Sequence, residues 1–272
     1  MSFIFVKIAI QNIYNMLETI KEIIRNAAAG IREVVNLDSV SKGEIGNILT
    51  IADKKSEEII INGLNAKFPD CRILSEEIAS EITKDNFKSF KLLFLVDPID
   101  GTTNYASGIP QAAISIGAYE FGEPKCEVVY DIFNKDLYES EVGKGLFLNG
   151  NKIQKRPTPI LKEAVVGSSW AYGETPRMLI KKWEQLIGKV ATLRVMGSAV
   201  LDLVMTATGQ FTCSVHNSLN PWDSGASLIM LKEMGVVVTN WKKEEFTIFD
   251  EEIIAAPKEI FNEFYNICFK EK

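Results

Sequence analysis

The segment from Leu93 to Asn104 constrains this chain more than any other. An apolar run typical of a buried strand ends abruptly in Asp97-Pro98-Ile99-Asp100-Gly101-Thr102-Thr103-Asn104. Proline fixes its own φ and disfavours a helical backbone at the residue before it, so we expect both aspartates in a stiff turn at the strand end. Rigidly held carboxylates suit a hard divalent cation such as Mg²⁺. The residues alone also allow an ordinary Asp-rich turn, because Asp, Pro and Gly are common turn residues.

The residues after the second aspartate add a second chemical feature. Gly101 to Asn104 can open a helix, and the first N–H groups of a helix point at anions such as phosphate. Candidate metal ligands and a candidate phosphate cradle are therefore adjacent in sequence. For Thr102, the simpler interpretation is a helix cap.

Composition excludes several classes of function. With 272 residues the chain is near the size at which two sub-domains form. A net charge of −6 without a basic block argues against nucleic-acid binding. The four cysteines are scattered without a CxxC motif, which suits a reducing compartment rather than a disulfide framework or zinc site.

The N-terminus and the histidine count narrow the prediction further. Residues 1–10 are apolar, but polar residues follow without a cleavage site, and no apolar run approaches the ~18 residues of a membrane helix. We therefore expect a cytoplasmic protein that does not bind membranes. Because His216 is the only histidine, the sequence argues against Ser-His-Asp and Cys-His catalysis, and we expect hydrolysis to depend on carboxylates, hydroxyls and metal ions.

Periodicity predicts an α/β chain in two parts. Helical spacing covers residues 5–35, a helix capped by Asp53 would run to Leu64, and residues 47–51, 71–74 and 91–96 read as strands. Strand-like segments at 112–120, 126–132 and 137–142 indicate an antiparallel sheet. Beyond a turn near residue 150, strands (164–168, 191–195, 211–215, 236–239, 253–256) alternate with helices (176–186, 199–208, 224–234). We predict sub-domains 1–150, carrying most candidate metal ligands, and 151–272, completing the site.

Four ordered segments together resemble the inositol monophosphatase family. The first is the Asp97–Asn104 run, which resembles the family signature. Thr50-Ile51-Ala52-Asp53 resembles the family's Thr-x-x-Asp, and Ile73-Leu74-Ser75-Glu76-Glu77 resembles its Gly-Glu-Glu with Ser75 in place of glycine. Pro221-Trp222-Asp223-Ser224-Gly225-Ala226 resembles its Trp-Asp segment, although the family more often continues with two alanines and a glycine. The match runs from about residue 42 to 233.

The resemblance implies a lithium-sensitive phosphatase that uses two to three Mg²⁺ ions, with the alternating helix and sheet layers shared with fructose-1,6-bisphosphatase. By resemblance, Glu76, Asp97 and the carbonyl of Ile99 hold a first ion. Asp97, Asp100 and Asp223 hold a second, and a weaker third lies nearer Glu76. The residues alone allow Glu76 to be a solvated acid after a strand and Asp223 to be a helix N-cap.

The resemblance also assigns catalytic roles. The hydroxyl of Thr102 and the carboxylate of Glu76 would orient the attacking water, and Asp53 would support them. The residues expected to contact the substrate are Gly101, Thr102, Thr103, Gly197, Ser198, Ala199, His216 and Asp223.

His216 departs from the family pattern. Family members carry a glutamate seven residues before the Trp-Asp aspartate, and this chain has His216 there. An imidazole can accept and donate one hydrogen bond each, and when protonated it can meet a second phosphate. Strict inositol specificity is therefore in doubt. The alternative is that His216 is a surface loop residue.

These observations predict a Mg²⁺-dependent phosphomonoesterase that hydrolyses inositol-1-phosphate. The alternatives are a fructose-1,6-bisphosphatase or broad sugar-phosphate phosphatase, and a non-catalytic regulatory metal-binding protein. The expected partners are a small phosphorylated polyol or sugar and a second copy of the chain. The homodimer would use strands 112–142 and the segment 165–172 with Trp170 and Tyr172, unless these aromatics fill the core.

Overall fold

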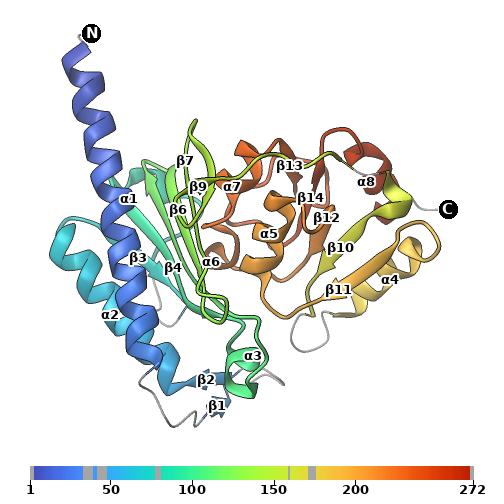
Figure 1. Ribbon diagram of the computed structural model, residues 1–272, viewed down its shortest axis with the longest axis horizontal. Helices are drawn as coiled ribbons and strands as arrows, with labels where there is room; N and C mark the ends of the chain where they lie inside the picture. The colour runs from blue at the N-terminus through green and yellow to red at the C-terminus, as the bar shows by residue number, and fades with distance from the viewer. Residues whose placement is uncertain are drawn as a thin grey trace.

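The computed structural model describes residues 3–32, 39–41, 48–76, 81–158, 160–170 and 176–269. Two β-sheets lie side by side, with helices outside each and between them (Figure 1). Helices α1 and α2 cover one face of the first sheet, α5 to α7 lie between the sheets, and α4 and α8 cover the outer face of the second. This layered α/β architecture confirms the predicted fold class.

The helices are α1 (Phe3–Arg32), α2 (Ile51–Lys67), α3 (Thr102–Ser107), α4 (Pro176–Leu186), α5 (Ala199–Thr208), α6 (Pro221–Ser224), α7 (Leu228–Glu233) and α8 (Phe261–Phe269). Short 3₁₀ turns occur at Phe87–Ser89 and Leu161–Glu163. Strands β1 (Ser39–Ser41) and β2 (Ile48–Thr50) form a small antiparallel pair beside α3.

The first sheet runs in the order β3 (Arg72–Ser75), β4 (Leu93–Asp100), β5 (Ala113–Glu120), β6 (Glu123–Asp131), β7 (Leu137–Glu141), β8 (Gly145–Leu148), β9 (Asn151–Lys152). Only β3 and β4 pair in parallel, so the antiparallel sheet expected across residues 112–142 is confirmed. The second sheet runs β11 (Thr192–Val195), β10 (Val165–Ser168), β12 (Cys213–His216), β14 (Ile253–Pro257), β13 (Val236–Thr239).

The two sheets share a continuous core. Leu95 of β4 and Ala255 of β14 belong to one buried cluster, which α5 and α7 fill from between the sheets. The division of the chain near residue 150 stays a prediction. Within the described residues, no helix is both long enough and apolar enough to span a bilayer.

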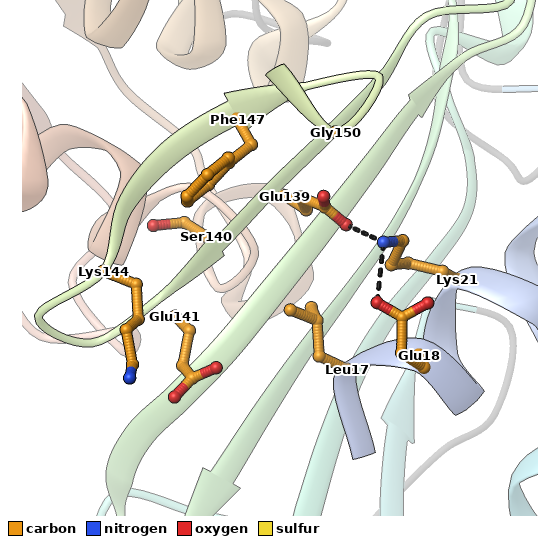
Figure 2. Close-up of a pocket in the computed structure, with 9 residues that line it drawn as sticks. All are labelled: Leu17, Glu18, Lys21, Glu139, Ser140, Glu141, Lys144, Phe147 and Gly150. Atoms are coloured by element: carbon orange, nitrogen blue, oxygen red, sulfur yellow. Dashed lines mark hydrogen bonds and ion pairs between the residues drawn. The ribbon is translucent and has the colours of Figure 1, made fainter. Parts of the chain in front are cut away.

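Helix α1 is held to the first sheet by apolar contacts and by one ion-paired lysine. Ile20 and Ile24 are fully buried against the sheet. The Lys21 ammonium lies 2.9 Å from Glu18 and 2.5 Å from Glu139 of β7, with both Lys21 and Glu139 largely buried (Figure 2). These groups line a half-open cavity of about 440 Å³ between α1 and the β7–β8 hairpin, with Leu17 and Phe147 on its walls.

Strand β4 extends further than expected. It continues through Asp100, with a shift in its pairing with β5 between Asp97 and Asp100. The two aspartates therefore lie on an irregular strand end rather than in a turn beyond it. Pro98 explains the irregularity, because it has no N–H to give to the ladder and is tolerated in strands mainly at such bulges.

Three other expectations are wrong in detail. Thr50, not Asp53, is the N-cap of α2, and Asp53 is the third residue inside the helix. The helix expected at 224–234 is divided into α6 and α7, and Gly225 between them packs so closely on Leu95 that a Cβ there would lie 2.2 Å from its Cδ1. Helix α8 was not expected, because the helices predicted from the sequence end at residue 234.

The Lys21 contacts generate a prediction about stability. Lys21→Met leaves the Glu139 carboxylate buried without a cation, so we expect unfolding free energy to fall by about 2 kcal/mol, between typical values for exposed and fully buried pairs. Urea denaturation measures the change. The double variant Lys21→Met/Glu139→Gln should recover most of it, and an equally unstable double variant would contradict the explanation.

Candidate active site

Three carboxylates converge between β4 and α6. Asp97 and Asp100 come from the irregular end of β4, and Asp223 comes from α6. Each offers one oxygen, and these oxygens all lie within 4.8 Å of one another. Asp97 and Asp100 are buried and Asp223 is half-buried. We call these three residues the carboxylate cluster.

Burial and mutual repulsion dominate the electrostatics of the cluster. Burial, reinforced by Glu76, Asp100 and Asp223, holds the pKa of Asp97 well above its usual range. Burial raises the pKa of Asp100 to about 6, against the hydrogen bonds that it accepts. The pKa of Asp223 is also raised, by burial first and then by Asp100.

The oxygen donors of this cluster fit a hard divalent cation. Oδ1 of Asp97 is buried and has no hydrogen-bond partner among the described residues. A buried polar atom without a partner is rare unless a water or an ion meets it. Oxygen-only, closely spaced carboxylates are the ligands that Mg²⁺ prefers, and a bound cation would reverse the unfavourable electrostatics.

Asp100 is fixed by the start of α5. Its carboxylate accepts hydrogen bonds from the Ser198 hydroxyl and from the Val200 N–H at 2.9 Å, and the Ala199 N–H lies at 3.3 Å. Ser198 is the N-cap of this helix. The structure places Ser198 and Ala199 against Asp100, and their expected contact with substrate stays a prediction.

Glu76 leaves the sheet beside Asp97. Strands β3 and β4 run parallel with Ser75 opposite Val96, so the next residues emerge at one edge. The Glu76 carboxylate is near enough to raise the pKa of Asp97, although it does not belong to the carboxylate cluster. Glu77 lies outside the described residues.

A hydroxyl–carboxylate pair lies beside the cluster. The Thr102 hydroxyl is 2.8 Å from Oδ1 of Asp53 and 2.9 Å from the Ile99 carbonyl oxygen, so it donates its one proton to either acceptor. Oδ2 of Asp53 accepts from the Thr50 N–H at 2.8 Å and from the Thr50 hydroxyl. This reciprocal cap explains the Thr-x-x-Asp spacing, because it fixes Asp53 on the first turn of α2.

Two glycines allow the loops of the site to approach one another. Gly101 precedes α3 with φ +83°, and a Cβ there would lie 2.8 Å from the Gln111 carbonyl oxygen. Gly197 has φ +82° and packs against the Asn104 amide. That amide donates to the carbonyls of Gln111 and Met196, both at 2.8 Å, and so joins α3 to the loop before α5. Thr103 is an exposed residue of α3.

His216 is not a surface loop residue. It is fully buried at the end of β12, and neither ring nitrogen has a hydrogen-bond partner among the described residues. Cys213 and Val215 of this strand pack toward α4 and α8, so strand alternation directs His216 toward α5. Burial lowers the pKa of His216 to about 3, so the imidazolium considered from sequence does not form near neutral pH.

Several residues at the site were not predicted from the sequence. Besides Asn104, the Ser56 hydroxyl donates to the Pro98 carbonyl at 2.7 Å and so supports the irregular strand end. Asp202 of α5 is buried, and neither carboxylate oxygen has a partner among the described residues. Burial and then Asp100 hold the pKa of Asp202 well above its usual range. No local pattern marks these residues, because their roles depend on distant segments.

Known proteins resemble this chain over nearly its whole length. The model of the inositol monophosphatase family matches residues 6–268. An inositol-1-monophosphatase of Bacillus subtilis is 31% identical over 257 residues, covering 91% of this chain and 95% of that protein. A fructose-1,6-bisphosphatase/inositol-1-monophosphatase of Thermotoga maritima is 32% identical, covering 82% and 87%. The crystal structure of the extragenic suppressor protein suhB from Bartonella henselae aligns with a TM-score of 0.84 at 28% identity, over 97% of this chain and 100% of that chain.

The raised pKa of Asp97 generates a prediction. A raised native pKa favours folding at low pH, and this contribution is lost as pH rises through that pKa. Asp97→Asn should therefore raise the melting temperature of the metal-free protein at pH 8 more than at pH 5. Differential scanning calorimetry in chelator measures both shifts. A destabilised variant at pH 8 would contradict this account of the site.

Proposed function

The chain belongs to the inositol monophosphatase family and is therefore a phosphatase, and from this premise we propose that it is a Mg²⁺-dependent phosphomonoesterase acting on inositol-1-phosphate. The observation that carries the proposal is the carboxylate cluster, whose oxygens lie within 4.8 Å of one another beside the Thr102–Asp53 pair. No other group of three His, Cys, Asp or Glu side chains in the described ranges meets the same criterion.

In this proposal the acidic residues hold two to three Mg²⁺ ions. Asp97 would be shared between two ions, Glu76 and the Ile99 carbonyl would complete one set of ligands, and Asp100 and Asp223 the other. Existing hydrogen bonds support this assignment of ligands. The N-terminus of α5 orients Asp100, and the Asn220 N–H, at 2.7 Å, orients Asp223. Bound Mg²⁺ would polarise the phosphoryl group and lower the pKa of the attacking water.

The protein's own groups would position the water and the phosphate. The Thr102 hydroxyl donates its proton to Asp53 or to the Ile99 carbonyl, so its oxygen can accept a hydrogen bond from the attacking water. Glu76, at the neighbouring strand end, would accept from the same water. Main-chain N–H groups of Gly101, Thr102 and Thr103 would hold the phosphate at the start of α3, where the helix dipole also favours an anion.

Substrate preference is the least constrained part of the proposal. A neutral, buried His216 replaces the acidic acceptor seen at this place in the family pattern, so polyol hydroxyls lose a charged partner here. A second phosphate on the substrate would find no positive charge at His216, because the imidazole is neutral. We therefore place inositol-1-phosphate first and broad sugar-phosphate hydrolysis second; the Thermotoga maritima relative, whose name includes both activities, supports the second.

Purified protein tested on four substrates distinguishes these candidates. The panel is inositol-1-phosphate, fructose-1,6-bisphosphate, glucose-1-phosphate and adenosine 3′,5′-bisphosphate, each with Mg²⁺ and with chelator. We expect the highest kcat/KM on inositol-1-phosphate and no turnover in chelator. Full turnover in chelator would contradict the metal mechanism, and absence of all turnover would favour a non-catalytic regulatory protein.

Thr102→Ala tests the role of the hydroxyl. The phosphate should be held mainly by metal ions and main-chain N–H groups, whereas the hydroxyl acts on the water in the transition state. We therefore expect kcat to fall by about 100-fold with KM within about threefold of wild type. A variant with normal kcat and only a raised KM would contradict this role, and Ser107→Ala, at an exposed hydroxyl at the end of α3, serves as the control.

We also propose a cytoplasmic homodimer. The four cysteines are all free, as expected in a reducing compartment. The Trp170 side chain is 59% exposed and does not fill the core, and Val195, opposite Ser168 at the end of β11, is 40% exposed. Exposed aromatic and aliphatic side chains of this kind are enriched in interfaces. Tyr172 lies outside the described residues.

Light scattering at micromolar concentration tests the dimer. We expect twice the chain mass for wild type and a monomeric mass for Trp170→Glu, since a carboxylate cannot be buried unpaired in an interface. Ile187→Glu, at an exposed aliphatic side chain just after α4 and outside both predicted interface segments, should leave the mass unchanged. A monomeric wild type would overturn the proposal.

A further inference from the structure

The backbone between α6 and α7 is pressed directly against the first sheet. A Cβ at Gly117 of β5 would lie 2.1 Å from the Gly225 carbonyl oxygen, and a Cβ at Gly225 would lie 2.2 Å from Cδ1 of Leu95 on β4. Only hydrogen fits at either position. The segment that follows Asp223 therefore has no room to move toward the sheet.

Two buried polar side chains of the sheet bind the same segment. The Tyr119 hydroxyl of β5 donates to the Gly225 carbonyl at 2.8 Å. The Glu127 carboxylate of β6 accepts from the Ile229 N–H at 2.8 and 2.9 Å and from the Met230 N–H at 3.2 Å. Glu127 thus caps the start of α7 from a different element, where Ser227, the residue at the N-cap position, makes no side-chain cap.

Glu127 is an unfavourable residue to bury for stability alone. It is fully buried, and burial raises its pKa to about 8 against the opposing effects of the N–H groups of α7 and of Lys232. An apolar side chain would fill this place without the cost of removing a carboxylate from water. Unlike an apolar side chain, a hydrogen-bond acceptor at this place fixes the position of the α7 backbone.

Asp223 depends on that position. Helix α6 is only four residues long, Pro221 to Ser224, and it continues into the clamped segment through the Gly225 N–H, which donates to the Pro221 carbonyl at 2.9 Å. Gly225 is two residues from Asp223 and the start of α7 is five, so a displacement of either is passed to Asp223 over a short stretch of backbone.

We propose that Glu127, assisted by Tyr119, is a positioning residue that holds Asp223 at the distance from Asp97 and Asp100 at which one divalent cation can be shared. The inference rests on the proposed function, in which Asp223 is a Mg²⁺ ligand. Within the described residues Glu127 makes hydrogen bonds to the backbone of α7 and none to the carboxylate cluster, so it acts only through α7 and the Gly225 link.

The test compares two glutamates at opposite ends of α7. In Glu127→Gln one of the two oxygens that face the Ile229 N–H becomes an NH2 group, a donor facing a donor, so the start of α7 should shift. Glu233→Gln is the matched control, because Glu233 accepts from the Gly143 and Gly145 N–H groups at 2.7 and 2.9 Å at the far end of the same helix. Mg²⁺ binding is measured by isothermal titration calorimetry without substrate, at temperatures equally far below each melting point.

We expect the Mg²⁺ dissociation constant to rise about tenfold in Glu127→Gln, as for other residues that orient metal ligands, and less in Tyr119→Phe. Glu233→Gln should stay within about twofold of wild type even if it melts at a lower temperature. Glu127→Gln should regain most of its kcat at saturating Mg²⁺. Wild-type Mg²⁺ affinity in Glu127→Gln would overturn this inference alone, whereas a wild-type protein that bound no Mg²⁺ would overturn the proposed function as well.

Discussion

The repulsion among three closely spaced carboxylates is the constraint on which the rest of this structure depends. Asp97, Asp100 and Asp223 bring oxygens within 4.8 Å of one another in a largely buried place, which raises the pKa of each. Such an arrangement persists only if the surrounding fold over-determines it. The protein offsets part of the cost with N–H donors to Asp100 and Asp223, and one oxygen of Asp97 has no partner among the residues that the structure describes.

The layered fold supplies that over-determination. The irregular end of β4 places two aspartates, and α5 and α6, packed between the sheets, bring their N-termini and Asp223 to it (Figure 1). Gly101 and Gly197 allow the loops to touch, and the Asn104 amide fastens them. On the α1 face of the same sheet, Lys21 pairs with Glu139 beside a separate cavity, so the two faces carry distinct polar structures (Figure 2).

Local sequence patterns predicted the parts of the site that local chemistry determines. The Asp97-Pro98 sequence pointed to the candidate site. The Thr-x-x-Asp spacing indicated a capping interaction, although the N-cap is Thr50. Periodicity gave α4 and α5 with their observed bounds. Contacts between segments about a hundred residues apart, such as Ser198 with Asp100 and Ile229 with Glu127, leave no local signature. The surface-loop alternative for His216 was wrong for the same reason, because its burial depends on α5 and β14 rather than on its neighbours in sequence.

The central claim is that the carboxylate cluster holds a divalent cation. A crystal grown with Mn²⁺ in place of Mg²⁺ tests it most directly, because Mn²⁺ accepts the same oxygen ligands and can be located by its anomalous scattering. We expect an anomalous peak coordinated by Asp97, Asp100 and Asp223 in wild type and its loss in Asp97→Asn. Well-ordered carboxylates with no anomalous peak between them at saturating Mn²⁺ would contradict it.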